Sequence, residues 1–246
     1  VPRARAERKA SHENAAKQAW VSKENNPMPL WILVFHIAVL GYWLGSELVI
    51  NSTYRYVSYS RTMPFDERQR LMDHVMVVDQ HVRYALVLQA MLGTMLAASY
   101  GLVPGGDATV KVAGVLGVIW LGFVEAVHRL HKTSAGRVLA AIDRGSRYVL
   151  MVVLAALAFG LVGAEWGMPL WLRLKLGLFA GVMACGVGIR FALIAHFRTW
   201  AIMARDGVTT ERNEVIERTY VRATSVLVLL WVFIAAIVVV SVVKPA

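Results

Sequence analysis

The 246-residue chain is 57% hydrophobic and only 17% charged, whereas soluble domains carry about a quarter charged residues. This composition excludes a soluble domain. The formal net charge of +10 suits basic connections at an anionic membrane surface, and we do not expect nucleic acid among the partners. A single cysteine, Cys185, excludes an internal disulfide and any Cys-based zinc or iron–sulfur site.

Apolar runs of about 20 residues, the length that crosses a hydrocarbon core of about 30 Å, follow one another along the chain. Residues 1–28 precede them and are polar and mixed in charge, so they predict a tail ahead of a single transmembrane domain at 29–246. The sequence therefore predicts an all-α integral membrane protein, a bundle of about six transmembrane helices. The predicted spans are residues 30–51, 81–102, 110–131, 148–162 (starting as early as 137), 170–196 and 224–243.

The polar connections between these spans differ in charge. The connections after the first, third and fifth spans are rich in Lys and Arg, and the last of them covers 198–222. The other two connections carry almost none beyond Lys111 and Arg173. By the positive-inside rule the basic connections are cytoplasmic, so both termini are predicted on the outer, periplasmic side of a bacterial inner membrane. Within the first connection, residues 66–80 have apolar side chains at helical spacing, so the second helix is predicted to begin before the membrane.

Histidines inside the predicted spans are candidate ligands, because ionisable groups in a membrane usually face a partner, a cavity or a cofactor. His36 lies one to two turns inside the first span, and His81 and His128 lie at the opposite membrane face. Haem iron takes imidazole ligands that project into a helical bundle. The sequence therefore predicts a haem b site at His36, with His81 and His128 as candidates for a second position.

Two other interpretations remain open for these side chains. Glu125 and His128 form a Glu-x-x-His turn, and His131 follows three residues later, so the three share a helix face and predict an alternative non-haem metal site. An equally good interpretation is that the histidines at the helix ends are polar residues at the level of the lipid headgroups and bind no metal or haem.

Three short motifs resemble one known family. Residues 35–45 read FHIAVLGYWLG, residues 171–176 read WLRLKL, and the last helix runs from Asn213-Glu214 to a Lys-Pro near the end of the chain. In these motifs the chain resembles the HemJ-type protoporphyrinogen oxidases and the related CopD (copper-resistance) membrane domains. The resemblance is that of a divergent member of this group.

The resemblance implies a haem-binding helical bundle in which His36 is a haem ligand and Lys175 is the lysine of the family's Trp-Leu-His-x-Lys-Leu motif. Arg173 stands where that motif has its histidine, so we expect a relative that keeps the scaffold and the haem rather than the oxidase itself, and enzymatic activity is left open.

The expected function is electron transfer, or anchoring of a redox complex as its membrane subunit, with the lipid bilayer, other membrane or periplasmic redox subunits and quinone as partners. Two alternatives stand beside it. One is a cofactor-free accessory subunit of a larger membrane complex, and the other is copper handling, as the CopD resemblance implies.

Overall fold

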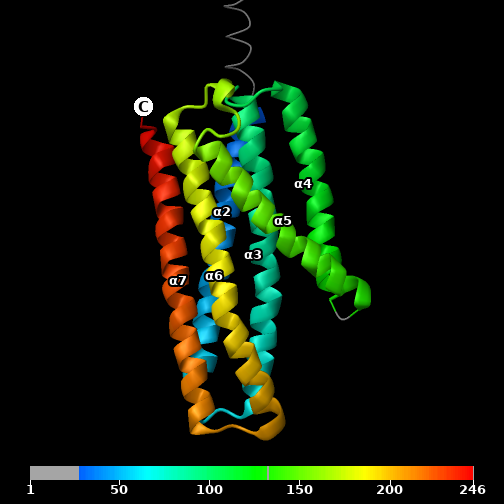
Figure 1. Ribbon diagram of the computed structural model, residues 1–246, viewed down its shortest axis with the longest axis vertical. Helices are drawn as coiled ribbons and strands as arrows, with labels where there is room; N and C mark the ends of the chain where they lie inside the picture. Colours follow the sequence, from blue (N-terminus) through cyan, green and yellow to red (C-terminus); the bar gives the residue numbers. More distant parts are fainter. Residues whose placement is uncertain (1–27, 132, 246) are drawn as a thin grey trace, which may run out of the picture.

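The computed structural model describes residues 28–131 and 133–245, and these residues form a bundle of long helices (Figure 1). The predicted tail at 1–28 lies outside the described residues apart from Met28, which begins the first helix. The elements are α2 (Met28–Tyr59), α3 (Phe65–Ser99), α4 (Gly106–Arg129), α5 (Ser134–Ala158), the 3-10 turn η1 (Ala164–Trp166), α6 (Leu170–Asp206) and α7 (Thr210–Val243).

Five of these helices, α2, α3, α4, α6 and α7, are long and apolar enough to cross a membrane. This confirms the prediction of an all-helical protein of the multi-pass membrane class. The remaining helix, α5, contains most of the predicted span at 148–162, but it starts at Ser134 and ends at Ala158. The charged residues Asp143, Arg144 and Arg147 interrupt its apolar sequence. For this reason α5 is long enough to cross a membrane but less apolar than the other five helices.

Four helices, α2, α3, α6 and α7, pack as an antiparallel bundle, and the other two lie against its outside. α4 packs on α3, and α5 runs diagonally from the far end of α4 back to the start of α6, on which it packs (Figure 1). Short connections join consecutive helices except between α5 and α6, where residues 159–169 include η1, and every pair of consecutive helices is in contact.

The four bundle helices divide along their length into two sections. The apolar section contains residues 28–51, 81–99, 170–190 and 224–243, and α4 and α5 flank this section. The distal end contains residues 52–59, 65–80, 191–206 and 210–223, and it extends beyond α4 and α5 at the bottom of Figure 1. The contrast is sharpest in α7, where 224–243 contain no charged residue and 210–223 contain three glutamates and three arginines.

The prediction that 198–222 form a connection between two helices is wrong, because this segment is itself helical except for a short turn at 207–209. α6 continues to Asp206, Gly207 takes a left-handed φ of 87° at its end, and α7 begins at Thr210. Glycine adopts such a φ without steric cost. The helices continue because their apolar faces pack together in a core built from all four helices: Tyr54, Val57, Met72, Trp200, Met203, Ile216, Tyr220 and Ala223.

The early start predicted for the second helix is confirmed, since α3 runs unbroken from Phe65 to Ser99. Residues 65–80 add about 24 Å of helix at 1.5 Å per residue. Most of their charged side chains face outward while Met72 and Val75 are buried, which is the pattern of a helix in a water-soluble bundle. Arg68 is the exception, because it is fully buried.

Candidate functional site

His36 lies on the face of α2 that packs against α3, in the apolar section. Its side chain is half-buried, and its Nδ1 atom is enclosed without a hydrogen-bond partner among the described residues. The backbone carbonyl of His36 accepts a hydrogen bond of 2.9 Å from Nε2 of Gln89 on α3. This bond between the two helices fixes the turn of α2 that carries the imidazole.

A glycine on α3 makes room for the imidazole. A Cβ atom at Gly93 would lie 3.4 Å from Cε1 of His36, so the ring rests directly on the helix backbone. Lys175 of α6 is the charged residue that acts electrostatically on this ring. Both residues lie in the apolar section, His36 on α2 and Lys175 on α6.

His81 does not join His36. It is exposed, and its Nδ1 lies 2.5 Å from the hydroxyl oxygen of Tyr42. His81 precedes Gly93 by 12 residues on α3, which corresponds to about 18 Å along the helix axis. One metal ion therefore cannot bind both histidines in this arrangement.

Glu125, His128 and His131 lie at the end of α4 and in the turn after it, and protein groups already engage two of them. Glu125 accepts a hydrogen bond from the hydroxyl of Tyr84 and forms an ion pair with Arg129 at 2.5 Å. Nδ1 of His131 lies 2.5 Å from the backbone carbonyl oxygen of His128. Among residues 28–131 and 133–245, no group of three His, Cys, Asp or Glu side chains is placed to hold a metal ion. The alternative non-haem site stays a prediction.

A buried polar cluster in the distal end was not predicted. Arg68 and His196 are fully buried there, and both side chains pack against Trp200. The His196 ring stacks on the Trp200 ring with a centroid distance of 5.2 Å, and the guanidinium carbon of Arg68 lies 5.2 Å from the same ring.

The cluster joins all four bundle helices through hydrogen bonds. Nδ1 of His196 lies 2.9 Å from the hydroxyl oxygen of Tyr54, and Nη1 of Arg68 donates to the side-chain oxygen of Asn213 at 2.9 Å. A buried polar group that is hydrogen-bonded across helices helps to specify one arrangement of a bundle. The spacing of His196 and Trp200, which are four residues apart on α6, is the sequence signal that could have revealed it.

Comparison of the chain with family models, with curated proteins and with solved structures found no match. The fold therefore defines the class of the protein: it is all-helical in its described residues, with five helices long and apolar enough to cross a membrane. A lipid bilayer is the environment that these helices indicate.

Proposed function

We propose that this protein binds haem b within a lipid bilayer and that His36 is an axial ligand of the iron. The observation that supports the proposal is the His36 imidazole, which lies between α2 and α3 with an enclosed nitrogen that lacks a partner among the described residues. A polar atom left without a partner at membrane depth is costly and commonly marks a functional position.

The neighbouring side chains suit this cofactor. Haem carries two carboxylate groups, and the ammonium group of Lys175, whose charge acts on His36, would be a suitable counter-charge for one of them. Gly93 keeps the surface of α3 flat where the ring lies. When bound, haem supplies one-electron chemistry, while the chain supplies a ligand, burial and a counter-charge.

The finer features belong to the same proposal. The protein is a divergent member of the HemJ/CopD group and lies in a bacterial inner membrane with both termini in the periplasm. It has six spans, because α5 crosses the membrane in addition to the other five helices. Its role is electron transfer, or anchoring of a redox complex, with a quinone or another redox subunit as the partner. The apolar second half of α5 supports the sixth span, since residues 148–158 carry no charge.

A reduced-minus-oxidised absorbance spectrum of the full chain, purified in detergent, tests the proposal. We expect a b-type signal that His36→Ala abolishes. The matched control is His81→Ala, which removes a histidine whose Nδ1 is already hydrogen-bonded to Tyr42 and which should leave the signal unchanged. Size-exclusion profiles verify that both variants fold. A wild-type protein without a Soret band, or a signal that persists in His36→Ala, contradicts the proposal.

A cofactor-free accessory subunit is the second candidate. It is favoured by the polar side chains that already form hydrogen bonds with other groups of the same chain, among them His81, Glu125 and His131. A protein that contains no haem and elutes only together with other membrane subunits would support this candidate. Elemental analysis of the same sample distinguishes copper handling, which requires stoichiometric copper without a Soret band.

A further inference from the structure

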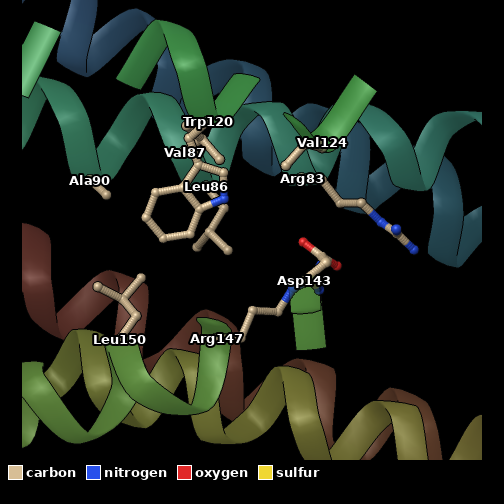
Figure 2. Close-up of a pocket in the computed structure, with 9 residues that line it drawn as sticks. All are labelled: Arg83, Leu86, Val87, Ala90, Trp120, Val124, Asp143, Arg147 and Leu150. Atoms are coloured by element: carbon tan, nitrogen blue, oxygen red, sulfur yellow. The ribbon is translucent and has the colours of Figure 1, made fainter. Parts of the chain in front are cut away.

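The buried polar cluster in the distal end contains a charged group without a charged partner. Arg68 is fully buried, and only its Nη1 atom donates a hydrogen bond, to Asn213. Its Nε and Nη2 atoms have no partner, and no carboxylate pairs with it, within the part of the chain that the structure describes. Asp143 on α5, drawn in Figure 2, is also buried, but Arg147 donates to it at 2.7 Å. Arg68 therefore places an uncompensated positive charge in the distal core.

His196 lies beside this charge, because both side chains pack against Trp200. Nδ1 of the imidazole lies 2.9 Å from the hydroxyl oxygen of Tyr54, whereas Nε2 is enclosed and has no partner in residues 28–131 and 133–245. A protonated imidazole has an N–H group on each nitrogen, and the one on Nε2 would have no acceptor here. The site therefore suits the neutral ring and disfavours the charged one.

The groups that face this imidazole carry no negative charge. From the neighbouring helices they are the hydroxyl groups of Tyr54 on α2 and Thr219 on α7, and the guanidinium group of Arg68 on α3. Its contacts on α6 are two aromatic rings. Glu217 is the acid whose charge reaches Arg68, and it already accepts two hydrogen bonds from Arg61, at 2.6 and 2.8 Å. A proton on the imidazole would thus add a second positive charge to a core that has no carboxylate to receive it.

The direction of the pH effect follows from this environment, since the distal end lies outside the apolar section. Burial and the charge of Arg68 lower the pKa of His196 from 6.5 to about 4. When the distal end is open to water, the imidazole takes up a proton near its ordinary pKa of about 6.5. The closed state is therefore fully stable above about pH 6.5, and this stability is lost as the pH falls from there to about 4.

From these observations we propose that the distal end is a pH-sensitive element and that His196 is its sensor. Protonation of His196 opens the four helices at this end and exposes the aromatic core around Trp200 to water. The inference is independent of the haem proposal. Tyr54, the partner of His196, follows His36 by 18 residues on α2, which corresponds to about 27 Å along the helix axis.

Hydrogen exchange of the full chain in detergent, measured by mass spectrometry at pH 7 and at pH 5, tests the proposal. Each exchange rate is divided by the rate of an unstructured amide at the same pH, so that the ratio reports the opening equilibrium. In peptides from 196–206 and 213–223 we expect the opening constant to rise roughly 20-fold at pH 5, given the lowered pKa of about 4. Peptides from the apolar section, such as 170–185, should not show this rise.

Two variants assign the effect to one histidine. His196→Gln removes the titrating group and keeps a side chain that can bond to the Tyr54 hydroxyl, so the rise should disappear whatever the overall stability of the variant. The matched control is His74→Gln, which removes an exposed histidine of the same distal end and should retain the rise.

A measurement on the wild-type protein covers the case in which His196→Gln does not fold. Exchange of the C2 hydrogen of histidine, followed by mass spectrometry across a pH series, reports the pKa of His196 directly and should give a value well below 6.5. A pKa at or above 6.5 would overturn the proposal, as would equal opening constants at the two pH values. A rise that survives in His196→Gln, or that disappears in His74→Gln, would overturn it too, because another group would then be the sensor.

Discussion

The distal end and the apolar section are built from the same four helices, yet different forces hold them together. The distal end has an aromatic core and a buried polar cluster around Trp200, and its outer faces carry many charged residues. The apolar section has a second core that includes Trp43, Val182 and Leu230, while its outer faces are apolar as well. The exposed side chains of Val228, Leu229 and Val232 on α7 illustrate this.

The difference is the one expected if water surrounds the distal end and lipid surrounds the apolar section. In water, burial of apolar surface drives helices together. In lipid this force is absent, and close van der Waals packing through small residues together with hydrogen bonds between helices takes its place. A substitution of the same kind should therefore have different consequences in the two sections.

The largest expected effect is that of Trp200→Ala. Trp200 is 5% exposed, and it contacts Phe65, Arg68 and His196. Its loss should cost about 3–5 kcal/mol, as is typical of a buried aromatic residue in a water-soluble core. Hydrogen exchange in the distal end, measured on the detergent-purified protein, reports the change in local unfolding.

Trp43→Ala in the apolar section is the matching substitution, since Trp43 is 4% exposed. It should destabilise the bundle less, because lipid rather than water surrounds the opened helices. Equal losses for Trp43→Ala and Trp200→Ala would contradict the division into two solvents.

A smaller loss is expected from Gly181→Leu, which tests close packing in the apolar section. A Cβ atom at this position would lie 3.2 Å from Cζ of Phe233 on α7, so a leucine must displace the Phe233 ring. Overpacking of this kind costs about 1–3 kcal/mol. Thermal unfolding in detergent measures it, with Gly186→Leu as the control because nothing lies within 4 Å of a Cβ there. Similar midpoints for both variants would refute the close-packing argument.

The smallest expected effect is that of Thr224→Val. The Thr224 hydroxyl donates to the side-chain oxygen of Asn51 at 3.0 Å and thereby links α7 to α2. Hydrogen bonds between membrane helices contribute about 0.6 kcal/mol on average. Ser225→Ala is the control, since Ser225 bonds only to the Val221 carbonyl of its own helix. The thermal midpoint should fall slightly for Thr224→Val and stay constant for the control.

The membrane class and most helix positions could be predicted because apolar runs depend only on local composition. The extent of the helices into the distal end could be predicted for α3, where apolar residues recur at helical spacing. It was missed for α6 and α7, because residues 198–222 are rich in charge. Their helical state depends on packing with Tyr54 and Met72, which are far away in the sequence.

The candidate site shows the same limit. His36 could be selected from the sequence because a histidine inside an apolar run is conspicuous. The placement of Gly93 and Gln89 against it depends on how α2 and α3 pair, which no local pattern specifies. The burial of Arg68 was missed for the same reason, because an arginine in a charged segment does not reveal which neighbour will cover it.

The position of α4 and α5 has a consequence for biogenesis. A chain that enters the membrane from its N-terminus delivers α2 and α3 first, then the outer pair, and only then the two helices that complete the bundle. Arg68 on α3 therefore emerges long before Trp200 and Asn213, the side chains that cover it in the finished protein. Until α6 and α7 arrive, the nascent protein is half a bundle whose inner face is open, and its last two helices convert it into a closed structure.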